Sequence, residues 1–171
     1  MATIKLIKEP APILHQPAER VREISSDIRH LIDSMIQTMH AARGVGLAAN
    51  QVDSPWSVLV ASDNGVPGKE LVLINPVLLK QSGRHTAAEG CLSLPGIACE
   101  VTRAARVTVQ GWDREGRTVT IEAENLLAKI LQHEIDHLAG RLFVDRLGVL
   151  KRRKLLKEYR NLQKALGQIE V

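Results

Sequence analysis

Aromatic side chains and cysteine are scarce in this chain. Aromatic residues make up 2% of its 171 positions, so a hydrophobic core must be built from aliphatic side chains. The two cysteines, Cys91 and Cys99, are too few for a disulfide framework and fit a reducing compartment. The sequence also lacks a run of about 18 apolar residues and an apolar segment after its first lysines, so it predicts neither a membrane span nor a signal peptide. We therefore expect a cytoplasmic protein with no membrane partner.

The size and the charge of the chain are ordinary for a globular protein. Hydrophobic residues make up 44% of the sequence, enough to bury a core in one domain that we expect to cover residues 1–171. The formal net charge of +4 favours an acidic partner such as RNA, but it fits any soluble protein, and nothing in the sequence indicates DNA binding.

The order of apolar and turn-forming residues predicts an α+β fold. Helices are expected from Ser25 or Ser26 to Met39, with Gly44 as the terminator, and at residues 125–139 and 150–166. Strands are expected at residues 57–61, 71–74, 107–110 and 119–122, of which the last two would form a hairpin. Short strands between separate helices, without a repeated βαβ order, favour α+β over a doubly wound sheet.

The strongest chemical signal is His133-Glu134-Ile135-Asp136-His137. Two histidines four residues apart project from one face of a helix and can bind one metal ion. A helical projection places both imidazoles and Glu134 at the apolar face of the expected helix. The opposite, polar side would carry Lys129, Gln132 and Asp136. A divalent cation would offset the cost of burying ionisable groups, although a hydrogen-bonded cluster without metal is the simpler alternative.

A catalytic zinc-type centre usually has three protein ligands, so a third ligand is needed. In the metzincin pattern the third ligand is a histidine, but the corresponding position here is Phe143. Thermolysin-like proteases use a downstream glutamate. The candidate, Glu158, lies in a cationic segment, where a solvated charge is the simpler interpretation. Cys91 lies between Gly90 and a Pro-Gly turn and offers a thiolate. On its own, however, Cys91 would more often be a small buried hydrophobic side chain.

A third segment is rich in small residues: Gly44-Val45-Gly46-Leu47-Ala48-Ala49-Asn50-Gln51. Alone, it predicts a helix terminator followed by a tight turn. It lacks the Lys-Ser/Thr ending of a phosphate-binding loop, which excludes that kind of nucleotide site.

Together, the three segments resemble the peptide deformylase family. Its blocks Gly-x-Gly-x-Ala-Ala-x-Gln, Glu-Gly-Cys-Leu-Ser and His-Glu-x-Asp-His are all present here, and in the family order. The resemblance covers most of residues 1–150 and is loosest in the C-terminal helix. Residues 97–100 lack an arginine that some relatives carry near the peptide-binding cleft, which leaves contacts beyond the methionine open.

The resemblance implies a peptide-deformylase-like α+β fold, with short antiparallel strands around a central metal-binding helix. It also implies a hydrolase that removes the formyl group from the N-terminal formyl-methionine of new polypeptides. One divalent cation would be bound by Cys91, His133 and His137, with water in the fourth position. Iron(II) is the expected native metal, and zinc, nickel or cobalt could occupy the same site.

Roles for further residues follow from the same resemblance. Glu134 would take up and deliver protons, and the Gln51 side chain and the Leu92 backbone N–H would stabilise the oxyanion. The residues expected around the methionine side chain are Val45, Gly46, Leu126 and Ile130, although apolar residues on the helix could simply be core. Asp136 would pair with Arg103 and brace the metal helix, unless it is exposed as the helical projection suggests.

The C-terminal helix has seven basic residues and one acidic residue between Lys151 and Lys164. Its expected apolar stripe consists of Leu155, Tyr159, Leu162 and Leu166. The resemblance implies docking on ribosomal RNA near the nascent-chain exit tunnel, and the alternative is a packed helix with a solvated basic face.

Two other functions are consistent with the motifs: a small metalloprotease, and a non-enzymatic module with a structural metal. The presence of Glu134 and Gln51 argues against the non-enzymatic module, because a purely structural metal site needs neither residue.

Overall fold

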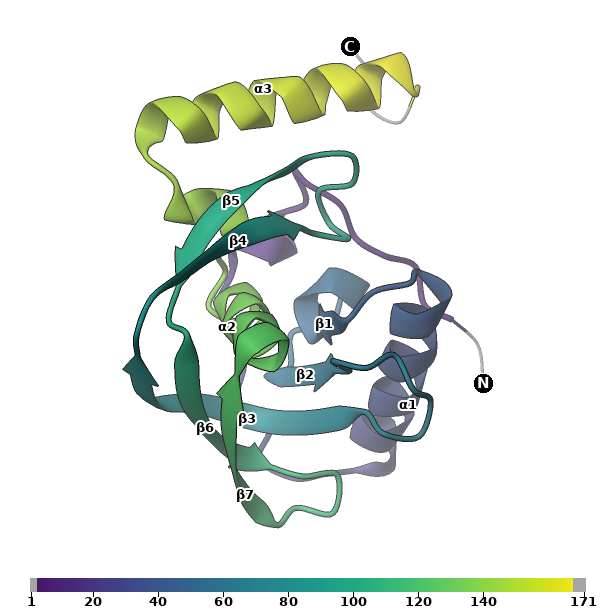
Figure 1. The fold of residues 1–171 in the computed structure, drawn as a ribbon. Coiled ribbons are helices and arrows are strands. Elements are labelled where there is room, and N and C mark those ends of the chain that lie inside the picture. The colour runs from purple at the N-terminus through teal and green to yellow at the C-terminus, as the bar shows by residue number, and fades with distance from the viewer. Residues whose placement is uncertain (1–2, 168–171) are drawn as a thin grey trace.

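A computed structural model describes residues 3–167 and shows two antiparallel sheets and three α-helices (Figure 1). The larger sheet has the strand order β1-β2-β3-β6-β7: Gly46–Ala48, Val58–Ala61, Leu71–Ser82, Arg106–Trp112 and Thr118–Glu124. The smaller sheet pairs β4 (His85–Gly90) with β5 (Ala98–Arg103). The α-helices are α1 (Ser26–Ala41), α2 (Asn125–Leu138) and α3 (Val149–Ala165), and short 3-10 turns lie at Pro12–His15, Ala49–Val52 and Phe143–Arg146. The expected α+β class is confirmed.

The larger sheet has apolar side chains on both faces. Along β2, Val58 and Val60 belong to the cluster of buried residues that includes the inner face of α1. The alternate residues Leu59 and Ala61 belong to the cluster that includes α2. Because successive side chains of a strand point to opposite faces, a strand covered on both sides must be continuously apolar. This explains the uninterrupted Val-Leu-Val-Ala run.

Helix α1 begins and ends close to where the sequence predicts. The Ser25 hydroxyl accepts a hydrogen bond from the Ile28 N–H at 3.4 Å, so Ser25 is the N-cap. At the other end, Arg43 rather than Gly44 takes the left-handed conformation, with φ of 54°. The chain turns there directly into β1, a strand that the sequence pattern does not predict.

The hairpin of β6 and β7 is confirmed, with Val109 opposite Ile121. The expected strand at residues 71–74 is longer than predicted and continues to Ser82. Asn75-Pro76 interrupts the apolar run at the predicted end, and the second half of the strand is largely exposed. Strands β4 and β5 were also missed, since they mix small, polar and charged residues. In Figure 1, β4 and β5 lie above α2 and most of the larger sheet lies below it, so α2 occupies the middle of the molecule between the two sheets.

Helix α3 lies across the end of the molecule, next to β4 and β5 (Figure 1). Tyr159 is buried in the cluster beneath it, and its hydroxyl donates a hydrogen bond to the Glu9 carbonyl at 3.1 Å. The expected apolar stripe is wrong at Leu166, which is 59% exposed at the C-cap of the helix. Gln163 is buried instead, and it donates to the Pro95 carbonyl at 3.4 Å. Within residues 3–167, no helix has the length and apolarity needed to cross a membrane.

Candidate metal centre and active site

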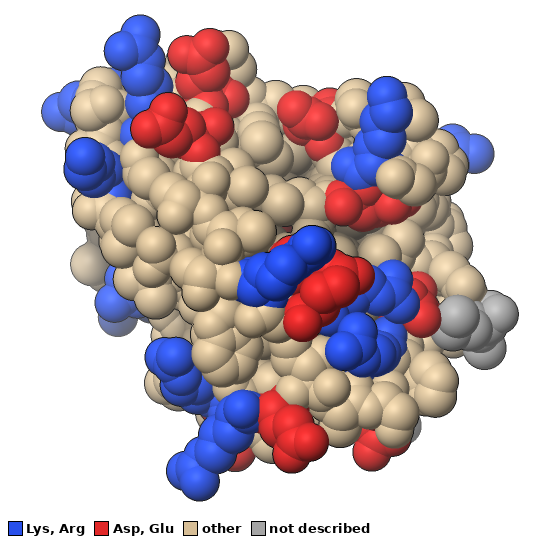
Figure 2. Space-filling view, turned by 90° about the horizontal axis from the view of Figure 1, so that it is seen from below, with Lys and Arg blue, Asp and Glu red and all other residues tan. Residues whose placement is uncertain are grey.

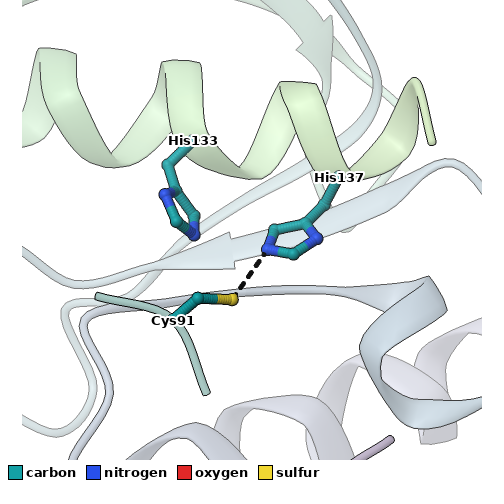
Figure 3. A group of neighbouring side chains, drawn as sticks. All are labelled: Cys91, His133 and His137. Atoms are coloured by element: carbon teal, nitrogen blue, oxygen red, sulfur yellow. Dashed lines mark hydrogen bonds between the residues drawn. The ribbon is translucent and has the colours of Figure 1, made fainter. Parts of the chain in front are cut away.

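Cys91, His133 and His137 converge, although Cys91 is more than forty positions from the histidines. Their potential ligand atoms all lie within 4.8 Å of one another. The Cys91 Sγ is 3.1 Å from His137 Nε2, and Figure 3 shows both imidazoles projecting from α2 toward the sulfur. A thiolate with two imidazoles is a donor set that suits iron(II), zinc, cobalt or nickel. The group fits a single divalent cation.

The two imidazoles lie in different electrostatic environments. Burial lowers the pKa of His137 well below its usual value, so this ring is neutral, the form that binds metals. Burial would also lower the pKa of His133, but hydrogen bonds with Cys91 and Glu89 raise it to about 10. A cation that binds here therefore displaces a proton from the site.

Glu89, at the end of β4, orients His133. Its Oε2 lies 3.0 Å from His133 Nδ1, which leaves Nε2 of that ring for a metal. Burial acts to raise the pKa of Glu89, but the hydrogen bonds from His133 and Arg103 lower it to about 2. Glu89 was not predicted as a site residue from the sequence. Its spacing from Cys91 could have indicated it, because side chains two residues apart on an extended segment point to the same face.

The carboxylate of Asp136 is buried in an ion-pair network behind the metal helix. Arg103 donates from Nη1 to Asp136 Oδ2 at 2.8 Å and from Nη2 to Glu89 Oε2 at 2.9 Å. Arg146 donates from Nη2 to Asp136 Oδ1 at 2.6 Å. The expected Arg103–Asp136 pair is thus confirmed. The prediction that Asp136 and Gln132 lie on an exposed, polar side of the helix is wrong. Both are buried: Asp136 is contacted by Arg103 and Arg146, and Gln132 bonds to the backbone of Ala104.

An Asp136→Asn variant is expected to lose about 3–5 kcal/mol of unfolding free energy, because the buried Arg103 guanidinium, and with it the exposed Arg146, loses the shared carboxylate. Urea denaturation of the metal-free protein would measure the loss, with metal retention measured alongside. The matched control is Glu124→Gln, which breaks the exposed Arg106–Glu124 pair and should change stability by less than about 1 kcal/mol. Equal stability of the two variants would contradict a bracing role for Asp136.

Glu134 lies in the same site, next to His133 in sequence. Its carboxylate is 4% exposed, and Oε2 has no hydrogen-bond partner among the described residues. Burial raises the pKa of Glu134 to about 7, although His133 and Arg103 act in the opposite direction. A carboxyl group with a pKa near neutrality is suited to both accepting and donating a proton.

Gln51 and Leu92 line the cavity together with Cys91. Gln51 Nε2 is 3.6 Å from the Cys91 Sγ and 3.2 Å from Ser93 Oγ, and its Oε1 accepts a hydrogen bond from the Ala48 N–H at 2.9 Å. The side chain is therefore held at both ends, with its amide nitrogen turned toward the sulfur. Leu92 follows the cysteine and lines the same cavity as Gln51.

The site opens into a cavity of about 360 Å³. Of the residues expected around a methionine side chain, Val45, Gly46 and Ile130 line this cavity. Leu126 is not among the lining residues and is 41% exposed, one helical turn before Ile130. Cys91, His133 and Glu134 also line the cavity, whereas His137 is fully buried behind them.

Comparisons with known proteins agree with this site. The model of the family described as polypeptide deformylase matches residues 3–153. A peptide deformylase from Acidobacterium capsulatum is 42% identical over 162 residues, covering 94% of this chain and 95% of that protein. A peptide deformylase from Alkalilimnicola ehrlichii is 43% identical over 173 residues, covering 100% of this chain and 96% of that protein.

Solved structures show the same architecture. A crystal structure of a peptide deformylase from Legionella pneumophila superposes with a TM-score of 0.92 at 37% identity, covering 98% of this chain and 99% of that one. A peptide deformylase from Synechococcus elongatus, crystallised in complex with actinonin, gives a TM-score of 0.86 at 39% identity, with 91% and 86% coverage. With the Cys/His/His group in place, the near-complete matches in sequence and structure show that the chain belongs to the polypeptide deformylase family, whose members remove N-terminal formyl groups.

Proposed function

We propose that Cys91, His133 and His137 hold one divalent cation, and that the residues around it hydrolyse the formamide bond of formyl-methionine on nascent polypeptides. The convergence of these three donors on one point is the observation that carries the proposal. When bound, the cation supplies Lewis acidity, which lowers the pKa of a coordinated water and polarises the formyl carbonyl. We propose iron(II) as the native metal, with zinc, nickel or cobalt as substitutes that the same donors accept.

Glu134 is proposed to be the proton carrier. As the oxygen of water forms its bond to the formyl carbon, the Glu134 carboxylate accepts the water's proton. The C–N bond then breaks, and Glu134 delivers the proton to the departing amine of methionine, so that formate and a free N-terminus result. In the metal-free site, burial raises the pKa of Glu134 to about 7, the direction that helps a carboxyl group to hold a proton between the two transfers.

Gln51 and Leu92 are proposed to stabilise the oxyanion that forms on the formyl oxygen. The amide nitrogen of Gln51 lies beside the Cys91 sulfur and is fixed by hydrogen bonds on both sides of the side chain. The backbone N–H of Leu92 is the second proposed donor. Donors fixed in advance need no rearrangement when the charge develops, and the loss of one typically slows a reaction by about 10²–10³-fold.

The formylated peptide is proposed to lie in the cavity as an extended strand. Within residues 3–167, β1 pairs only with β2 and β4 pairs only with β5, so each has one edge without a neighbouring strand. Both border the cavity, through Gly46 and Gly90, and an extended peptide could pair its backbone with such an edge. The methionine side chain would contact Val45, Gly46 and Ile130. Leu126 is left out of this proposed contact, because it does not line the cavity.

A Gly46→Val variant should lose about 100-fold or more in kcat/KM. A Cβ atom at position 46 would lie 2.5 Å from Glu134 Oε1 and 2.8 Å from Ile130 Cγ2, so the carboxylate and the cavity wall must both shift. Steady-state kinetics on a formyl-methionyl peptide would measure the effect. Gly148→Ala is the control, because nothing lies within 4 Å of its Cβ position. A Gly46→Val variant with normal KM would contradict the peptide contact.

The activity itself is tested by anaerobic loading with iron(II), followed by incubation with formyl-Met-Ala-Ser. We expect formate and free Met-Ala-Ser in equal amounts from the loaded protein, and neither product after the metal is removed. Cleavage of an internal peptide bond would instead favour a metalloprotease. A loaded, folded protein that leaves the formyl group in place would favour a non-enzymatic module.

The surface of α3 supports a second, separate proposal, that the protein docks on ribosomal RNA near the exit tunnel in the cytoplasm. All seven basic side chains from Lys151 to Lys164 are exposed, while Tyr159 and Gln163 anchor the opposite side of the helix. Phosphate contacts release counterions, so binding to ribosomes should weaken steeply as salt rises. Absent or salt-insensitive co-sedimentation with ribosomes would contradict this proposal.

A further inference from the structure

The charged residues that line the cavity are divided by depth. The two acidic ones, Glu89 and Glu134, are each 4% exposed and lie inside the site. The Glu89 charge is balanced by Arg103 and His133. The two cationic ones, Arg43 and Lys129, are exposed and half-buried, respectively. Among residues 3–167, no salt bridge joins either cation to a carboxylate within 4.0 Å. The mouth of the cavity is therefore positive.

Both cations are held next to the strand edges that border the cavity. Arg43 occupies the left-handed turn between α1 and β1, three residues before Gly46. The Lys129 ammonium donates a hydrogen bond to the Ala88 carbonyl of β4 at 3.1 Å. One charge thus accompanies each of the two edges between which the substrate is proposed to lie.

Several surface charges elsewhere are paired with a charge of opposite sign. On the face seen in Figure 2, basic and acidic side chains alternate and intermingle. The turn between β6 and β7 is an example, since Arg117 pairs there with both Asp113 and Glu115. Two cations without an acidic partner at the opening of a binding cavity form a complementary surface for a negatively charged ligand.

We propose that Arg43 and Lys129 select substrates with aspartate or glutamate in the two positions after the formyl-methionine. The proposal rests on the proposed function of this site. With the methionine side chain in the cavity, the next two side chains of an extended peptide point to opposite sides, so each can approach a different wall of the opening. Carboxylates there gain an opposite charge, and lysines meet a like charge.

The test compares kcat/KM for formyl-Met-Glu-Glu-amide and formyl-Met-Gln-Gln-amide, which differ only in two charges. The amide ends ensure that any carboxylate comes from a side chain and not from the peptide terminus. At low ionic strength we expect the acidic peptide to be favoured by about three- to tenfold, as two partly exposed ion pairs allow. The preference should shrink with added salt, because charges at an opening are screened. Formyl-Met-Lys-Lys-amide should be the poorest substrate.

Variants of the two cations identify the source of the preference. Arg43→Asn removes the charge with a residue that tolerates the left-handed backbone at this position, and Lys129→Gln removes the other charge. Each should reduce the Glu/Gln ratio, and Arg43→Glu combined with Lys129→Gln should bring it below one. The control is Lys80→Gln, an exposed charge outside the cavity lining, which should leave the ratio unchanged.

The outcomes separate this inference from the proposed function. A ratio near one in the unmodified protein, with the neutral peptide still deformylated, overturns the role of Arg43 and Lys129 and leaves the activity intact. A ratio that falls equally in Lys80→Gln also overturns it, because net charge would then be the cause. No turnover of the neutral peptide by the iron(II)-loaded protein would contradict the proposed function itself.

Discussion

Replacement of Cys91 by alanine is expected to remove both the bound metal and the activity. The remaining ligands would be two imidazoles, and no other cysteine, histidine, aspartate or glutamate of residues 3–167 joins their group. Changes to residues that only orient a ligand cost about 10–100-fold in metal affinity, so loss of a ligand should exceed that range. Deformylation should fall to the level of the metal-free protein.

Metal analysis after gel filtration, and the thiolate absorption of a cobalt-loaded sample, would check this result. The matched control is Cys99→Ala, because Cys99 lies on β5 outside the ligand group. This variant should retain its metal and its cobalt spectrum. A Cys91→Ala variant that kept a stoichiometric metal and cleaved internal peptide bonds would instead support the metalloprotease alternative.

The parts of the site that could be predicted are those with a local signal. The i, i+4 spacing of His133 and His137 places both rings on one face of α2, whatever surrounds the helix. The N-cap of α1 and the alternating strands β6 and β7 are local in the same sense. The approach of Cys91 is not local, since it depends on the pairing of β4 with β5 and on the packing of both over α2. The motif resemblance, and not periodicity, pointed to it.

The failures have a common physical cause. The helical projection assigned Asp136 to solvent because it counted only hydrophobic residues, whereas Arg103 and Arg146 make burial of this carboxylate tolerable. Strands β4 and β5 escaped detection because they mix small, polar and charged residues, among them the functional Glu89. Polar residues buried for function weaken the hydrophobic pattern on which such predictions depend.

A Glu134→Gln variant should separate metal binding from catalysis. Glutamine has the shape of the glutamate but cannot carry a proton between water and the leaving amine. We expect metal content near that of the unmodified protein and a loss of about 10²–10⁴-fold in kcat, the usual range for a positioned acid–base group. Single-turnover deformylation at saturating peptide would measure the loss. An active Glu134→Gln variant would require another proton carrier.

The same variant should be more stable than the unmodified protein when both are metal-free. Burial raises the pKa of Glu134 from 4.5 to about 7, so ionising this group costs more in the folded chain than in the unfolded chain. Below pH 4.5 the carboxyl is protonated in both states and carries no penalty. The penalty grows as the pH rises toward about 7, above which the folded protein must bury the charge. Urea denaturation across this interval should therefore show the stability advantage of Glu134→Gln widening with pH. A constant advantage would indicate that the residue is not held in the buried, unpaired state that suits it to proton transfer.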